Sequence, residues 1–128
     1  MRQLARLLFK FARSRIGRRW VSWGLTHMSF ALPVDKLRQT PTLLAFHHPK
    51  PAYPLHILIV PRAAIANLAA LAPTPDTTAF LTDLLTTTQS LIVEFDLERR
   101  GYRLICNGGP NQDIPHLHFH LISEQPRP

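Results

Sequence analysis

The stretch Gln112-Asp113-Ile114-Pro115-His116-Leu117-His118-Phe119-His120-Leu121-Ile122 decides how this chain folds and where its chemistry lies. Its three histidines alternate with apolar residues, and side chains of a β-strand alternate between the two faces of a sheet. We therefore expect His116, His118 and His120 to share one face, with the intervening apolar side chains on the other. The apolar face can pack into the core and so accounts for the folding of the strand. Buried imidazoles need hydrogen-bond partners, so a face of three histidines is a poor core and indicates a functional site.

Two kinds of chemistry suit such a row of histidines. Three neutral imidazoles could bind zinc and leave a fourth position for water, although same-face neighbours on one strand splay apart. Alternatively, one histidine attacks phosphorus while its neighbours bind the phosphate oxygens. The preceding Asn107-Gly108-Gly109-Pro110-Asn111 is a glycine-rich turn whose backbone N–H groups can face an anion. The sequence therefore favours phosphoryl chemistry.

Residues 116–122 resemble the signature of the histidine triad (HIT) superfamily, in which three histidines alternate with apolar residues. Residues 102–108 are similar to the penultimate strand of that family and its asparagine. Residues 56–62 are similar to the strand that carries a fourth histidine, and residues 43–49 to the strand that opens the nucleotide pocket. The resemblance covers residues 32–123, in the order of the family and at nearly its spacings.

The resemblance implies hydrolysis or transfer of a nucleoside monophosphoryl group through a covalent nucleotidyl-histidine on His118. It implies that His116 and His120 stabilise the phosphate oxygens, and that His56 lies beside the triad and sets its tautomers. It assigns substrate binding to a second set of residues: Phe46, His47, His48, Asn107, Gln112 and Asp113. We therefore expect a hydrolase of nucleoside phosphoramidates or similar nucleotide conjugates, with no cofactor and no metal.

Two alternatives from other classes remain. One is a non-enzymatic nucleotide-binding or membrane-tethered interaction protein, and the other is a zinc enzyme whose ligands are the triad. Turnover of a fluorogenic adenosine phosphoramidate, with and without a chelator, separates the three hypotheses.

This sequence departs from the family pattern at positions that the resemblance links to substrate recognition. His48 stands where the family usually has a ribose-binding aspartate, and Asp113 where phosphoramidases tend to have a serine. The loop from Asn107 to His116 is short compared with that of the phosphoramidase branch. His120 argues against the uridylyltransferase branch, which has glutamine at that position.

Residues 32–128 are expected to form one α+β domain, an antiparallel sheet of about five strands covered on one side by a long helix. Strands are expected at 43–47, 55–60, 102–106 and 116–122, after an extended entry at 32–37. We expect a short helix over residues 63–71 and a long helix from an N-cap at Asp76 to about Leu97. No apolar stretch of about 18 residues or more predicts a transmembrane span.

Residues 1–31 are expected to form a separate basic amphipathic segment. Seven of the 15 basic residues lie in residues 1–34, which hold no acidic residue, so this segment carries the net charge of +7. Its leucines and Phe11 follow helical spacing, with basic side chains opposite. We expect peripheral contact with an anionic membrane. Packing on the domain and an organellar presequence are the alternatives.

The expected partners are a nucleotide-type substrate and a second copy of the chain. One small sheet leaves an edge strand that pairing between two copies would cover, and small HIT members usually pair. No base-reading module accompanies the arginines, so no specific nucleic-acid binding is expected. The expected location is the cytoplasm, with the membrane periphery and an organelle as the alternatives.

Overall fold

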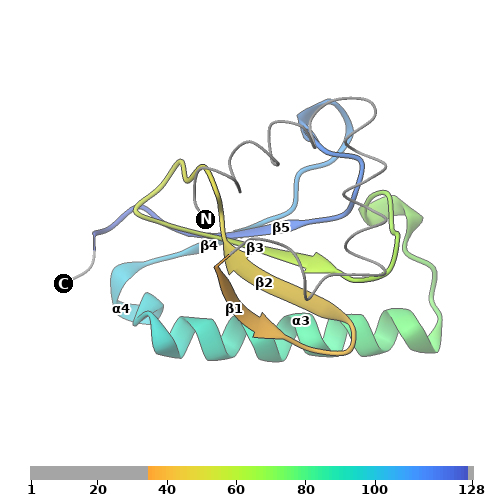
Figure 1. The fold of residues 1–128 in the computed structure, drawn as a ribbon, viewed down its shortest axis with the longest axis horizontal. Coiled ribbons are helices and arrows are strands. Elements are labelled where there is room, and N and C mark those ends of the chain that lie inside the picture. The colour runs from red at the N-terminus through yellow and green to blue at the C-terminus, as the bar shows by residue number, and fades with distance from the viewer. Residues whose placement is uncertain (1–34, 127–128) are drawn as a thin grey trace.

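The computed structural model describes residues 35–126 of the chain (Figure 1). The amphipathic helix expected within residues 1–31 and the domain boundary expected after residue 31 lie outside the described residues. Both therefore stay predictions. Within residues 35–126, no helix is long and apolar enough to cross a lipid bilayer.

Five antiparallel strands form one sheet in the described part of the chain. They are β1 (Lys36–Gln39), β2 (Leu43–His47), β3 (Leu55–Pro61), β4 (Arg103–Ile105) and β5 (Phe119–Ser123). Their order across the sheet is β1-β2-β3-β5-β4, so β3 is central and β4 lies at one edge. Together with one long helix, this sheet confirms the predicted α+β class.

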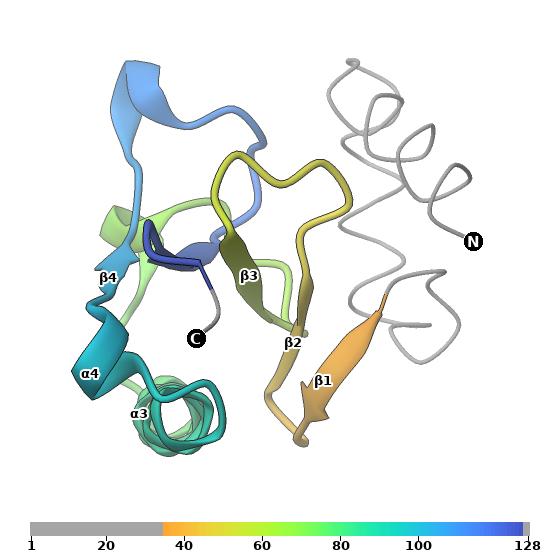
Figure 2. The same cartoon turned by 90° about the vertical axis from the view of Figure 1, so that its left-hand side faces the viewer.

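Helix α3 (Pro75–Glu94) covers one face of the sheet, and Figure 2 shows it end-on against the strands. The predicted N-cap, Asp76, was wrong by two residues. The hydroxyl of Thr74 caps the helix instead, because it accepts a hydrogen bond from Thr77 N–H at 3.2 Å. Pro75 suits the first helical position, where its missing N–H needs no partner.

The end of α3 also differs from the prediction, which extended the helix to about Leu97. Asp96 adopts a left-handed conformation, with φ of 57°, and this interrupts the helix after Glu94. A short helix, α4 (Leu97–Arg100), then follows and ends at Gly101. The φ of 83° at Gly101 is a conformation that glycine adopts readily.

The helix predicted over residues 63–71 was largely wrong. The structure has a single 3₁₀ turn there, η2 (Leu68–Ala70), capped by the Asn67 side chain, which accepts from Ala70 N–H at 2.9 Å. The Ile65 carbonyl accepts a hydrogen bond from Leu117 N–H at 2.7 Å. A helix through Ile65 would compete for that carbonyl, so the tertiary contact overrides the helical propensity of the alanines and leucines.

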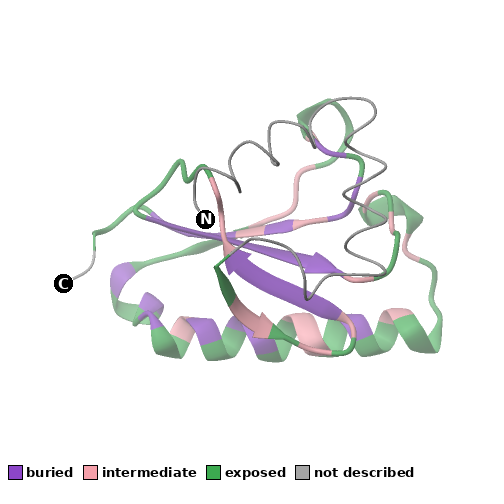
Figure 3. Ribbon diagram, in the orientation of Figure 1, coloured by how far each residue is buried: buried purple, intermediate pink, exposed green. Residues whose placement is uncertain are grey.

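The hydrophobic core lies between α3 and the sheet, where the buried residues of Figure 3 gather. Alternate strand residues face the helix, namely Leu43, Ala45, Leu55, Ile57, Ile59, Phe119 and Leu121. They pack with Phe80 and Leu91 of α3, and burying such a side chain contributes about 1.5–3 kcal/mol. Because strand side chains alternate, His56 and His120 lie on the face opposite α3.

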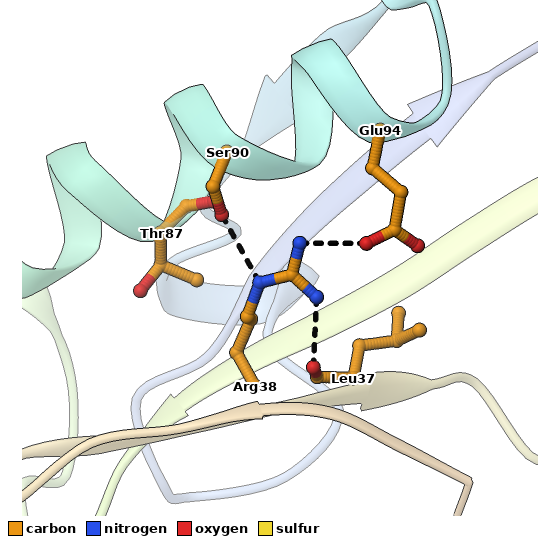
Figure 4. A network of polar contacts seen from close by, with 5 residues as sticks. All are labelled: Leu37, Arg38, Thr87, Ser90 and Glu94. Atoms are coloured by element: carbon orange, nitrogen blue, oxygen red, sulfur yellow. Dashed lines mark hydrogen bonds and ion pairs between the residues drawn. The ribbon is translucent and has the colours of Figure 1, made fainter.

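Strand β1 is tied to α3 by the side chain of Arg38 (Figure 4). Its guanidinium donates to Ser90 Oγ at 3.2 Å, to Glu94 Oε1 at 2.6 Å and to the Leu37 carbonyl at 2.9 Å. The flank of α3 that carries Ser90 and Glu94 therefore lies beside β1. The other flank lies toward the β4 edge of the sheet (Figure 2).

Candidate active site

Strand pairing brings three histidines together on the sheet face opposite α3. His48 directly follows β2 and lies across from His56, where its N–H donates to the His56 carbonyl at 2.8 Å. His120 is a diagonal neighbour of His56, because Leu58 pairs with His120 in the register. Ring centroids are 4.3 Å apart for His48 and His56, and 5.1 Å apart for His56 and His120. Three segments far apart in the sequence thus build one histidine cluster.

The strand predicted for the triad begins later than the alternation indicated. β5 starts at Phe119, so His116 and His118 lie in the loop that leads into it. In this loop the N–H of Leu117 donates to the carbonyl of Ile65 and not to a neighbouring strand. The prediction of three histidines along one strand face is therefore corrected: His120 belongs to the strand, and the other two are positioned by backbone carbonyls.

Those carbonyls determine where the protons of the first two rings lie. His116 is 2% exposed, and its Nε2–H donates to the Pro61 carbonyl at 3.0 Å. The Nδ1–H of His118 donates to the His116 carbonyl at 2.7 Å. A carbonyl only accepts, so neutral His118 carries its proton on Nδ1 and a lone pair on Nε2. The site therefore offers an imidazole nitrogen suited to nucleophilic attack.

A second chain of hydrogen bonds runs through His56 to His120. Ala52 N–H donates to His56 Nδ1 at 3.1 Å, so the proton of neutral His56 lies on Nε2. His56 Nε2 and His120 Nδ1 are 2.8 Å apart. His56 donates in this contact, and the proton of neutral His120 therefore lies on Nε2. The His120 ring, 5.1 Å from that of His118, adds an N–H donor beside the candidate nucleophile.

Burial lowers the pKa of four histidines, the three of this cluster and the neighbouring His116. It lowers the pKa of His120 to about 4, where His118 and His56 also act in the same direction and Asp113 opposes them. It lowers the pKa of His48 to about 3, again aided by neighbouring histidines. The pKa values of His56 and His116 are lowered by burial as well. These four rings are therefore neutral at pH 7.

Of the substrate-binding residues expected on β2, the structure brings only one to the histidine face. Phe46 pairs with Leu58 and shares the face of His56. His47, the next residue, lies on the helix side, where its ring meets Phe95 edge-on at 6.0 Å. Consecutive strand residues cannot share a face, so the His47 ring lies apart from the cluster.

Asn107 is half-buried at the start of the loop that follows β4. Ile105 pairs with His120 in the register of β4 and β5. Continuing this antiparallel register by two residues would place Asn107 opposite His118. The loop then turns at Gly109, whose φ of 56° favours glycine, into the 3₁₀ turn η3 (Gly109–Asn111).

Gln112 and Asp113 follow this turn and differ in what they contact. The Gln112 side-chain amide donates to the carbonyls of Ala66 and Ile114, at 2.8 and 2.9 Å, and so holds the loop in place. Asp113 is exposed, and its negative charge favours the protonated form of His120, so it acts to raise the pKa of that ring. Gln112 therefore stabilises the conformation of the loop, whereas Asp113 influences the pKa of His120 in the cluster.

Sequence reasoning missed the backbone donors of the loop at residues 49–54. Lys50 N–H donates to His48 Nδ1 at 2.9 Å, as Ala52 N–H does to His56. The Tyr53 ring also meets the His56 ring edge-on at 5.4 Å. The three prolines of the loop lack an N–H, so only Lys50, Ala52 and Tyr53 are left as backbone donors. The proline spacing is the signal that could have identified them.

The zinc alternative lacks a donor set in residues 35–126. No group of three or more histidine, cysteine, aspartate or glutamate side chains is arranged there to hold a metal ion. Three ring nitrogens are instead engaged within the protein: His118 Nδ1 with a carbonyl, His56 Nδ1 with a backbone N–H, and His56 Nε2 with His120 Nδ1.

Known proteins are similar to this chain in sequence and in fold. The HIT domain family model matches residues 30–127. An HIT-like protein of Synechococcus elongatus is 38% identical over 93 residues, which span 71% of this chain and 79% of that protein. The purine nucleoside phosphoramidase of Escherichia coli is 29% identical over 99 residues, or 74% of this chain and 80% of the enzyme. The HIT family hydrolase of Legionella pneumophila superimposes with a TM-score of 0.69 at 26% identity, covering 79% of this chain and 90% of that one.

Proposed function

Because this chain belongs to the HIT domain family, we propose that it hydrolyses nucleoside phosphoramidates or related nucleotide conjugates through a nucleotidyl intermediate on His118. The hydrogen bond from His118 Nδ1–H to the His116 carbonyl carries the proposal, since it leaves the Nε2 lone pair for attack. Similarity to HIT family hydrolases supports the class of reaction. Similarity to a purine nucleoside phosphoramidase supports the class of substrate.

The proposed reaction has two steps. In the first, His118 Nε2 attacks phosphorus, a P–N(His118) bond forms, and the amine leaves with the electron pair of its P–N bond and a proton from water. In the second, hydroxide or water attacks phosphorus, the bond to His118 breaks, and a nucleoside monophosphate is released. The hydrogen bond to the His116 carbonyl stabilises the positive ring of the intermediate, and His120 Nε2–H can donate to a phosphoryl oxygen.

Two tests address this proposal directly. Turnover of a panel of nucleoside phosphoramidates and other nucleotide conjugates by the purified protein identifies the leaving group and base. Mass spectrometry of acid-labile adducts identifies the residue that carries the nucleotide. Absence of turnover with retained nucleotide binding would favour the non-enzymatic alternative.

A second proposal is that the chain forms a homodimer through the β4 edge and the adjacent flank of α3. Leu81 and Leu85 lie on the flank away from Arg38, and both are exposed, Leu85 at 59%. Leu104 of β4 pairs with Leu121, so its exposed side chain points to the same side of the sheet as α3. A second copy would cover this apolar surface together with the edge strand.

We expect sedimentation at micromolar concentration to show a dimer, and Leu85→Glu with Leu104→Glu to give monomers. Val93→Glu is the matched control, because Val93 is 81% exposed on α3 but lies on its solvent side. A monomeric wild-type chain, or a dimer unaffected by the double change, would contradict the proposed interface.

A third proposal concerns residues 1–30, which lie outside the described residues. Their seven basic side chains account for the whole net charge, and each can contribute about 1 kcal/mol near an anionic surface. We expect the full chain to bind anionic but not neutral vesicles, and Arg6→Glu with Arg13→Glu to weaken binding in flotation assays.

The matched control for this experiment is Arg99→Glu with Arg103→Glu, which changes the charge equally. These two arginines form exposed ion pairs with Asp96 and Glu124, and such pairs contribute little to stability. A chain that begins at Leu32 should lose vesicle binding and keep catalysis. Aggregation or unfolding of that shorter chain would instead make residues 1–31 part of the domain core.

A further inference from the structure

His48 forms a third ring against the hydrogen-bonded pair of His56 and His120. Its centroid is 4.3 Å from that of His56, with 31° between the ring planes. It is 6.2 Å from that of His120, with the planes 20° apart, so the two rings are nearly parallel. The pairing of His48 with His56 described above fixes this arrangement, since the two residues lie opposite each other across neighbouring strands. His48 thus covers the pair from the β2 side.

The rings of His48, His56 and His120 form an array whose hydrogen bonds are compatible only with neutral imidazoles. Lys50 N–H points at His48 Nδ1, and Ala52 N–H points at His56 Nδ1. Protonation of either ring would place a second hydrogen on a nitrogen that already accepts one. Likewise, protonation of His120 would place a hydrogen on Nδ1, which His56 Nε2–H already faces. A proton gained by any of the three rings therefore breaks a hydrogen bond within this array.

Charged and titratable groups reach the pair from several elements. His118 faces His120 from the loop before β5, Asp113 acts on His120 from the loop after η3, and Tyr53 meets His56 from the proline-rich loop. An anion within about 4–6 Å raises the pKa of a histidine by about 1–3 units. A carboxylate at position 48 would therefore add to the effect of Asp113 and charge the pair at higher pH, whereas an imidazole with a pKa of about 3 adds no charge.

We propose that His48 is a positioning residue whose neutral ring covers the His56–His120 pair and keeps it uncharged, so that the site works at mildly acidic pH. The catalytic test of this role rests on the proposed function, in which His120 acts beside His118. The test by charge state is independent of that function, because the protonation of His56 and His120 can be measured in the protein without substrate.

The experiment compares His48→Asp with His48→Asn in the full chain. The asparagine side chain can accept from Lys50 N–H as His48 Nδ1 does. The two variants have nearly the same shape and differ in charge and in the NH2 group that replaces one carboxylate oxygen. The first measurement is the tautomer and pKa of His56 and His120, from nitrogen-15 chemical shifts of the imidazoles between pH 4 and 8. The second is the pH dependence of kcat/KM on an adenosine phosphoramidate.

We expect His48→Asp to raise both histidine pKa values, and the midpoint of the acidic limb of kcat/KM, by about one to two units relative to His48→Asn. Coincident titrations of the two variants would overturn the proposal, whatever their absolute activity. If neither the wild-type chain nor a variant turns over substrate, the proposed function fails and the nitrogen-15 titration still decides the role of His48. His48→Glu carries the same test should His48→Asp not fold.

Discussion

Replacing His118 with alanine is expected to lower kcat for an adenosine phosphoramidate by about 1,000-fold or more, because it removes the nucleophile and with it the covalent route. Nucleotide affinity should stay within about tenfold, or roughly 1.4 kcal/mol, since the other histidines and Phe46 remain in place. Steady-state kinetics and equilibrium binding of a nucleoside monophosphate measure the two effects separately.

A sharper form of this experiment uses His118→Gly. The missing ring leaves space beside the His116 carbonyl, which held His118 Nδ1–H at 2.7 Å in the wild-type chain. Added imidazole should restore part of the turnover by occupying that space, and the wild-type chain should gain nothing from it. Full activity of His118→Ala, or a nucleotidyl adduct on another residue, would contradict the assignment of the nucleophile.

The same assay separates phosphoryl transfer by histidine from zinc chemistry. In the proposed reaction the chain's own imidazoles contact the phosphoryl group, so activity should survive exhaustive chelation. Stoichiometric, tightly bound zinc whose removal abolishes activity, and whose return restores it, would favour the metal alternative.

Strand periodicity was enough to predict which faces of β3 and β5 carry histidines. Because alternation by two residues is a local property of the backbone, His56 and His120 could be assigned to one face and Leu121 to the other without tertiary information. The sequence could not predict where β5 begins. That depends on the contact between Leu117 N–H and the Ile65 carbonyl, residues more than fifty positions apart, which draws the first two histidines out of the strand.

The sequence likewise could not predict which group each histidine ring contacts. The position of His48 opposite His56 depends on the register of two strands joined by a proline-rich loop, and the residue types alone do not set that register. Helix α3 shows a related limit. Thr74 and Asp76 are both good N-caps by type, and the choice between them depended on where the following N–H groups point.

Stability is expected to fall between pH 6.5 and 5, because the buried histidines of the candidate site resist protonation. Four rings have a folded-state pKa below the ordinary value of 6.5, with His120 at about 4 and His48 at about 3. Above pH 6.5 both the folded and the unfolded chain hold these rings neutral. Below it the unfolded chain binds protons that the folded chain does not, so the free energy of unfolding decreases as the pH falls toward the folded-state pKa values.

Each such histidine can contribute a slope of at most about 1.4 kcal/mol per pH unit, reduced for His48 and His120 by their partial contact with solvent. The window above pH 5 is diagnostic, because ordinary carboxyl groups titrate near pH 4 and contribute little there. Urea unfolding at pH 6.5, 6.0, 5.5 and 5.0 measures the slope. His120→Gln is expected to flatten it even where it lowers stability at pH 7, because the variant has one resistant ring fewer. A midpoint that does not change across the window would mean that the cluster takes up protons in the folded state, and the neutral array from His48 to His120 would then be incorrect.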